Sequence, residues 1–188
     1  MTDPYITCPA FENDRYLLRL VEPADVPDLL GVYSDEKAVP LFNSDNCHGD
    51  DFHYTTLERM QRAVDFWMES YREKWFIRWV IVDRKDQKAL GTIELFNRQA
   101  QDYFNDCGLL RLDLQSGCEN AADIHEILSL IVPPAYDLFQ CKMIATKVIP
   151  AAVKRREAVE RLGFTASAEA LVGHDGTCYT DYYVRMRG

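Results

Sequence analysis

The feature that most constrains the fold of this sequence is a strand, a helix and a second strand in direct succession. Residues 107–114 (CGLLRLDL) have the apolar character of a buried strand, and residues 122–139 carry apolar side chains at helical spacing. Residues 143–149 again have strand character. A helix that connects two strands of one sheet requires those strands to be parallel. We therefore expect strands 107–114 and 143–149 to run parallel.

The preceding part of the sequence predicts antiparallel pairing. Residues 75–82 (WFIRWVIV) and 89–96 (ALGTIELF) are strand-like and flank a short charged turn, which is the pattern of a hairpin. With the parallel pair, this hairpin indicates an α/β chain with a mixed sheet and helices on its faces. We expect one domain over residues 1–188, of which 1–14 form an N-terminal extension. The other elements expected are strand 16–20, helices starting near Glu22 and Thr55, helix 153–162 ended by Gly163, and strands from Phe164 and over 179–186.

Two consecutive prolines, Pro133 and Pro134, lie inside the helix expected over 122–139. Proline removes a backbone donor and clashes with the preceding turn of a helix. We therefore expect this helix to kink there or to restart with Pro133 as its first residue.

The charge of the chain excludes some partners. Its net charge is -9 and its pI is about 4.9, whereas nonspecific binding to nucleic acids or to an anionic membrane needs a basic surface. No apolar run approaches the ~20 residues of a membrane span, and the polar first residues do not resemble a signal peptide. We therefore expect a cytoplasmic protein with reduced thiols.

The cysteines do not indicate a metal site. The six cysteines include no C-x-x-C pair, so a zinc ribbon or redox motif is unsupported. The segment Cys47–His53 (CHGDDFH) has the residue types of a zinc site, but its spacing matches no closed site. We expect a solvated loop there and no bound metal.

Charge is distributed unevenly along the chain. Acids predominate over residues 1–53, and bases predominate over residues 142–161. Two interpretations remain open. Either these charges form solvated surface, or a cationic wall for an anionic ligand faces an acidic rim for a cationic one.

Three segments, in this order and spacing, resemble the GNAT N-acetyltransferase superfamily, nearest its ribosomal-protein branch. They are residues 16–33 (YLLRLVEPADVPDLLGVY), 79–95 (WVIVDRKDQKALGTIEL) and 157–164 (EAVERLGF). The resemblance implies the acyl-CoA N-acyltransferase fold, a mostly antiparallel sheet whose one parallel pair separates at one end. It also implies acetyl-CoA as the cosubstrate.

The family binds the pyrophosphate of acetyl-CoA in a loop between its fourth strand and the next helix. There, glycines let backbone N–H groups approach the phosphates, and the helix N-terminus favours negative charge. In this sequence Cys118 and Asn120 take the places of the glycines, and Glu119 lies between them. By the resemblance, pantetheine would follow the backbone of Leu112 and Leu114, because an unpaired strand edge can bind an amide chain. The cofactor-binding residues implied are Leu112, Leu114, Gln115, Gly117, Cys118, Asn120, Ala121 and Ala122.

The sequence departs from the family at other positions. The family often has Asn and, three residues later, Ser in the segment where this chain has Ala152 and Arg155. Many members carry a Tyr as general acid where this chain has Val159. Glu94, on the hairpin strand that faces the acceptor in the family, is the candidate catalytic residue. Its alternative interpretation is a surface glutamate on an alternating strand.

Two functions follow. The first is transfer of an acetyl group from acetyl-CoA to a primary amine of a cationic small molecule or a protein N-terminus. The alternative is a GNAT-fold protein that has lost catalysis and binds a ligand or a partner protein. Neither nucleic acid nor membrane is an expected partner, and a homodimer is left open. The sequence does not identify the acceptor or the general acid and base.

Overall fold

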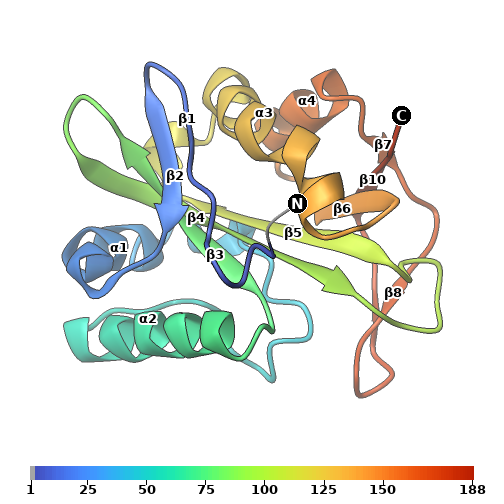
Figure 1. Cartoon of the computed structure of the whole chain (residues 1–188), viewed down its shortest axis with the longest axis horizontal. Coiled ribbons are helices and arrows are strands. Elements are labelled where there is room, and N and C mark those ends of the chain that lie inside the picture. The colour runs from blue at the N-terminus through green and yellow to red at the C-terminus, as the bar shows by residue number, and fades with distance from the viewer. Residues whose placement is uncertain (1–2) are drawn as a thin grey trace.

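The computed structural model describes residues 3–188, which form one eight-stranded sheet with helices on both faces (Figure 1). The strands of this sheet are β1 (Phe11–Glu12), β2 (Tyr16–Leu20), β3 (Ile77–Asp83), β4 (Lys88–Arg98), β5 (Cys107–Leu114), β6 (Met143–Lys147), β7 (Thr165–Ala166) and β10 (Tyr182–Met186). A separate small sheet consists of β8 (Leu171–Val172) and β9 (Cys178–Tyr179). The α-helices are α1 (Val26–Tyr33), α2 (Leu57–Arg72), α3 (Ala121–Leu138) and α4 (Val153–Arg161), and short 3-10 helices span Pro23–Asp25, Val39–Leu41 and Ser116–Cys118.

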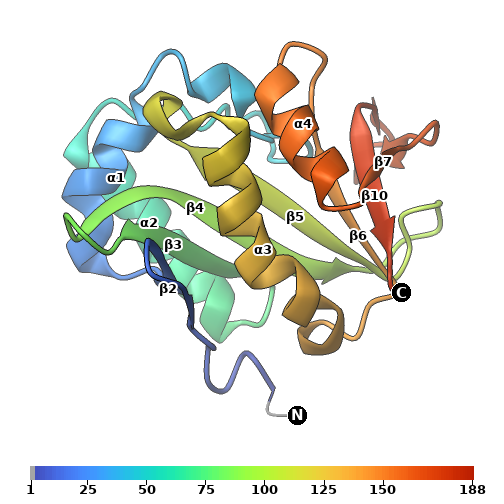
Figure 2. The same ribbon diagram turned by 90° about the horizontal axis from the view of Figure 1, so that it is seen from above.

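The order of strands across the main sheet is β1-β2-β3-β4-β5-β6-β10-β7. All neighbours pair antiparallel except β5 and β6, which are parallel, as the sequence predicted. The parallel pairing runs only from Cys107 opposite Met143 to Leu110 opposite Thr146. Beyond Leu110, β5 continues while β6 diverges, and Figure 2 shows the two strands separating toward one end.

The two faces of the sheet are covered by different helices. Figure 1 shows α3 and α4 on one face and α1 and α2 on the other. Helix α2 is amphipathic, with Met60, Val64 and Trp67 buried, so it packs its apolar side on the sheet. The side chain of Thr56 caps its N-terminus by accepting the Arg59 N–H at 3.2 Å. Both layers therefore follow from apolar periodicity and local capping.

Of the two outcomes expected at the prolines of helix α3, a kink or a restart, the restart is wrong. It is one helix from Ala121 to Leu138, with Pro133 and Pro134 inside it. Apolar side chains on both sides of the prolines, including Ile124 and Ala135, are fully buried against the sheet. Packing of this continuous apolar face outweighs the lost backbone hydrogen bonds.

The boundaries of two other strands differ slightly from those predicted from the sequence. The strand expected from residue 75 begins at Ile77, because Lys74 has a positive φ of 60° and Trp75 projects from the turn after α2. The strand expected over 179–186 is divided at Asp181, which has a φ of 66°. Within residues 3–188, no helix is both long and apolar enough to cross a membrane.

Candidate functional site

A buried arginine side chain lies at the end of β5, where this strand has separated from β6. Arg155, from the first turn of α4, is only 3% exposed. Its Nη1 group donates to the carbonyl oxygens of Leu112, at 2.9 Å, and Leu41, at 2.8 Å. Its other terminal nitrogen forms an ion pair with Glu119. The carbonyl of the unpaired part of β5 therefore already has a donor, and that donor comes from the chain itself.

The loop between β5 and α3 is also internally bonded. The Ser116 N–H donates to a carboxylate oxygen of Asp35 at 2.9 Å. The N–H groups of Cys118 and Glu119 donate to the carbonyls of Gln115 and Ser116, at 3.0 and 3.2 Å. Burial alone would raise the pKa of Asp35, but hydrogen bonds, first of all from Ser116, outweigh it and lower that pKa. An ionised carboxylate of the protein thus occupies the loop.

The structure brings together the residues that the sequence assigned to the cofactor. Leu112 and Leu114 are buried in β5, and Gln115, Gly117 and Cys118 form the loop. Asn120 is the N-cap of α3 and accepts the Asp123 N–H at 3.0 Å, and Ala121 and Ala122 follow in the first turn. Burial raises the pKa of Cys118, so its thiol is not activated. That these residues bind acetyl-CoA remains a prediction.

The groove in this conformation does not fit acetyl-CoA. A pantetheine amide that pairs with the backbone of β5 needs the Leu112 carbonyl, which Arg155 holds. A pyrophosphate in the loop would meet the carboxylates of Glu119 and Asp35. The sequence indicates this poor fit only in part. It shows Arg155 at the family's serine position and an acid in the loop, but not that the two side chains form a pair.

Glu94, the candidate catalytic residue, lies in a buried network of charged side chains on the opposite face of the sheet. Its two carboxylate oxygens accept from Arg78 and from Arg111, the latter at 2.7 Å. Arg78 also donates to Asp113 at 2.9 Å, and Tyr33 donates to the same oxygen of Asp113 at 2.7 Å. Glu94 is therefore not a surface residue, because only 2% of it is exposed.

The two carboxylates of this network titrate differently. Burial alone would raise the pKa of Glu94, but attraction to Arg78 and Arg111 outweighs it, and the pKa is lowered. Burial raises the pKa of Asp113, against the opposing effects of Arg78 and Tyr33. A carboxylate with a lowered pKa and two arginine partners is a weak proton acceptor. The geometry therefore favours a positioning role for Glu94, and its catalytic role remains a prediction.

Two adjoining cavities open on this face, and α2 lines one of them from Arg59 to Trp67. One encloses about 640 Å³ and has aromatic walls, with Arg78, Glu94 and Arg111 among the residues that line it. The other encloses about 650 Å³ and lies between β4 and the β8 segment. The two cavities share Asn46, Phe96, Arg111 and His174. We call the first of them the aromatic cleft. Its volume suits a small-molecule ligand.

Part of the uneven charge of the sequence is neutralised by ion pairs. Some of the acids in the first third and some of the bases in the segment 142–161 pair with near neighbours in the chain, and others pair across the fold. These pairs are Asp3–Lys74, Asp25–Arg19, Asp45–Lys147, Asp50–Arg59, Glu119–Arg155 and Glu157 with both Lys154 and Arg161. This pairing does not favour two opposed charged walls. In residues 3–188, no group of three or more His, Cys, Asp or Glu side chains could hold a metal ion.

Comparisons with known proteins agree with the fold described above. A family model described as an acetyltransferase (GNAT) domain matches residues 15–165. Among curated proteins, none matches the sequence significantly. Similar solved structures include a ribosomal-protein-S5-alanine acetyltransferase from Vibrio fischeri, with a TM-score of 0.71 and 17% identity, over 95% of this chain and 96% of that one.

Two further structures have the same fold. A putative ribosomal-protein-serine acetyltransferase from Vibrio cholerae has a TM-score of 0.69 and 10% identity, over all of both chains. A ribosomal L7/L12 alpha-N-protein acetyltransferase solved in complex with coenzyme A has a TM-score of 0.68 and 13% identity, over 95% of this chain and 98% of that one. At these identities the likeness concerns the fold, whereas the family model covers well over half of the sequence. The chain belongs to the GNAT acetyltransferase domain family.

Proposed function

We propose that this chain is a GNAT-fold protein that binds a ligand in the aromatic cleft and does not use its acetyl-CoA groove as the enzymes of the family do. One observation carries the proposal: Arg155 is buried beside the unpaired end of β5 and holds the Leu112 carbonyl. The groove is closed by a side chain of the fold itself, while a cavity of about 640 Å³ is open on the other face.

The energy needed to open the groove supports this choice. Acetyl-CoA would have to move Arg155 away from two carbonyls and from Glu119. Separating a buried ion pair typically costs about 3–5 kcal/mol. Each 1.4 kcal/mol changes a dissociation constant tenfold, so the affinity for acetyl-CoA would fall by roughly 10²–10⁴. A family member with an open groove has no such penalty.

A second candidate function is N-acetyl transfer from acetyl-CoA to a primary amine of a small molecule or a protein N-terminus. The parallel β5–β6 pair and the N-terminus of α3 beside its open end support it, as does the family match. Some neighbouring structures are titled ribosomal-protein acetyltransferases, which favours a protein N-terminus as the acceptor in that case. In this function, acetyl-CoA would displace Arg155.

Release of free CoA thiol tests the choice between the two functions. The wild-type chain is incubated with millimolar acetyl-CoA and, in separate reactions, with phenylalanine, spermidine and a peptide that has a free N-terminus. We expect no thiol release above the reaction without protein. Release that depends on both the chain and one of these amines would overturn the proposal and establish the second candidate.

A further inference from the structure

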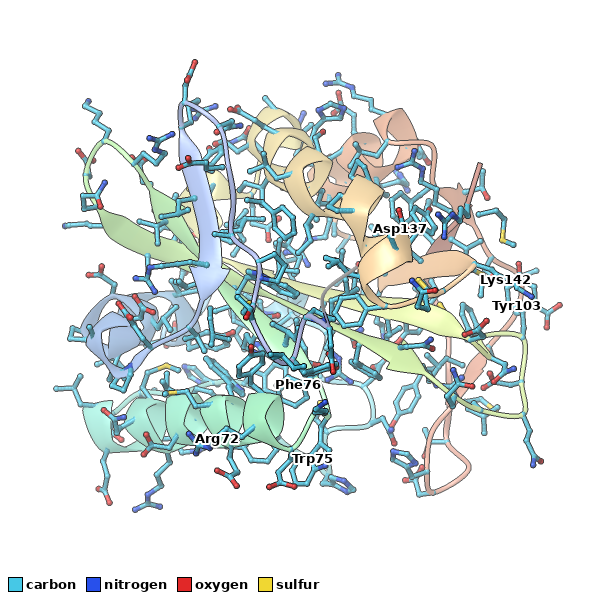
Figure 3. All side chains as sticks on the ribbon, viewed as in Figure 1. Arg72, Trp75, Phe76, Tyr103, Asp137 and Lys142 are labelled. Atoms are coloured by element: carbon cyan, nitrogen blue, oxygen red, sulfur yellow. The ribbon has the colours of Figure 1, made fainter. Side chains whose placement is uncertain are left out.

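The aromatic cleft has an unusual rim for a protein surface. Phe66 and Trp75 are 52% and 56% exposed, and their ring centroids lie 6.3 Å apart. Phe76 lies 6.0 Å from Phe66 and completes a cluster of three rings. Figure 3 shows Trp75 and Phe76 together just past the end of α2. Exposed apolar groups gathered at the mouth of a cavity mark a binding site more often than scattered ones do.

Phe66 and Trp75 are the exposed rings of the rim, whereas the ring of Phe76 already lies 5.9 Å from the guanidinium of Arg78. Deeper in the cleft, the guanidinium of Arg78 lies 4.2 Å from the ring centroid of Trp67. The guanidinium of Arg59 likewise lies 4.1 Å from the ring centroid of Tyr54. These inner rings already have cationic partners from the chain. A ligand that enters the cleft therefore meets flat apolar surface at the rim and arginines farther in.

The charges inside the cleft favour an anion over a cation. The charged residues lining it are three arginines, Arg59, Arg78 and Arg111, and two acids, Asp50 and Glu94. Both acids are engaged, since Arg59 and Tyr54 donate to Asp50, and Arg78 and Arg111 donate to Glu94. An ammonium group would find its acceptors occupied. A carboxylate would find a surplus of guanidinium groups.

Arg111 has unused donors at the place where the two cavities meet. One terminal nitrogen donates to Glu94, and the other donates to the carbonyl of Asp45 at 2.8 Å. Each of these terminal nitrogens carries a second N–H, because a guanidinium has five N–H donors. Within residues 3–188, the Nε atoms of Arg111 and Arg78 also have no protein acceptor, but both are buried and do not face the cleft. The terminal nitrogens of Arg111 are therefore the donors suited to a ligand with acceptor oxygens.

From these observations we infer that the aromatic cleft binds a small carboxylate that bears an aromatic ring. The ring packs on Phe66, Trp75 and Phe76 at the rim, and the carboxylate points toward Arg111. The inference deepens the proposed function by naming the ligand class, and it does not require acetyl-CoA. It also differs from the cationic amine expected from the sequence, because several of the acids that suggested an amine, among them Asp25, Asp45 and Asp50, have basic partners in the fold.

Calorimetric titration of the wild-type chain without CoA tests the ligand class. The probes are 3-phenylpropionate, 2-phenylethylamine, which has the ring but the opposite charge, and propionate, which has the carboxylate alone. We expect 3-phenylpropionate to bind at least ~10-fold tighter than either other probe, which is the factor that one good contact supplies. Equal or tighter binding of 2-phenylethylamine would overturn the inference, as would no binding of 3-phenylpropionate at millimolar concentration.

Two variants locate the site. Trp75→Ala removes a rim ring, and we expect it to weaken the binding of 3-phenylpropionate by ~10-fold. The matched control is Tyr103→Ala, because Tyr103 is also an exposed aromatic residue, at 48%, and lies on the β4–β5 loop away from the cleft in Figure 3. We expect the control to leave the affinity unchanged. An unchanged affinity in Trp75→Ala would show that the probe binds elsewhere.

A third variant, Arg111→Lys, tests the anion partner. We expect this variant to bind 3-phenylpropionate more weakly and 2-phenylethylamine as wild type does. Lysine keeps the charge but loses the planar pair of donors. If this variant does not fold, the probe comparison and Trp75→Ala still decide the inference. Failure of the probes to bind would refute the ligand class alone, whereas CoA binding and thiol release test the closed groove.

Discussion

Glu94 and Asp113 belong to one buried network, but their pKa values are shifted in opposite directions. Each accepts hydrogen bonds from Arg78, yet the pKa of Glu94 is lowered and the pKa of Asp113 is raised. The difference follows from the number of arginines, since Glu94 contacts both Arg78 and Arg111, and Asp113 contacts Arg78 alone. Their amide variants should therefore have different consequences for stability.

We expect Glu94→Gln to destabilise the fold by about 3–5 kcal/mol, because it leaves two buried guanidinium groups without their anion. Asp113→Asn keeps an acceptor for Tyr33 and Arg78, and we expect it to cost less than about 1.5 kcal/mol, the net value of an ordinary hydrogen bond. Urea unfolding at pH 7 measures both free energies. Equal losses in the two variants would contradict the opposite pKa shifts of the two carboxylates.

The raised pKa of Asp113 also predicts a pH dependence. Because its folded-state pKa lies above its unfolded-state pKa, which is about 3.9, the folded state binds the additional proton. This contribution to stability is complete below the unfolded-state pKa and is lost as the pH rises through the folded-state pKa. The Asp113→Asn variant has no titratable group at this position. Relative to this variant, wild type should lose stability as the pH rises from about 4. The free energies of urea unfolding of both proteins are measured at several pH values. If they change in parallel with pH, the raised pKa of Asp113 is refuted.

At the scale of elements, the close approach of β4 and β5 depends on a glycine. A Cβ atom built on Gly91 would lie 2.1 Å from the carbonyl oxygen of Asp113, which is backbone and cannot move aside alone. We expect Gly91→Ala to destabilise the protein by about 1–3 kcal/mol or more, as overpacking does. The measurement is the free energy of urea unfolding.

Gly31→Ala in α1 is the matched control for this substitution. An added Cβ on Gly31 meets nothing within 4 Å, and alanine in an exposed helix position stabilises by roughly 0.5–1 kcal/mol relative to glycine. The two Gly→Ala changes should thus have opposite signs. An unchanged free energy of unfolding in Gly91→Ala would show that β4 and β5 separate easily at this point.

Elements with strong periodicity were predictable from the sequence, and their boundaries were less so. The β5–α3–β6 succession predicted the parallel pair because a crossover helix allows no other arrangement. The sequence did not decide whether α3 continues through Pro133 and Pro134, because the local cost of the prolines is visible in the sequence and the burial of Ile124 and Ala135 is not. Tertiary packing decides such cases.

The candidate sites were predictable only in part for a similar reason. The loop residues from Gln115 to Asn120 gather at the open end of β5, where the family resemblance placed them. The sequence shows Arg155 and Glu119 as two separate departures, 36 residues apart. Their pairing depends on how α4 docks, and the aromatic cleft depends on how α2 ends beside β3. Neither is a local property of the chain.

For the whole molecule, the two sides of the sheet differ in how accessible they are. On the side where the family binds acetyl-CoA, Arg155 and the carboxylates of Asp35 and Glu119 occupy the end of β5 and its loop. The other side carries an open cleft with an exposed aromatic rim. Our proposal of ligand binding without acetyl transfer rests on this difference.

Calorimetric titration with CoA tests the closed groove most directly, at one salt concentration, on three proteins. They are wild type, Arg155→Ser/Glu119→Ala, and the control Arg161→Ser/Glu157→Ala, which removes an exposed Arg–Glu pair from the same helix. We expect wild type and the control to bind no tighter than millimolar, and Arg155→Ser/Glu119→Ala to bind at least ~10-fold tighter. Low-micromolar binding by wild type, with no gain in Arg155→Ser/Glu119→Ala, would contradict the closed groove.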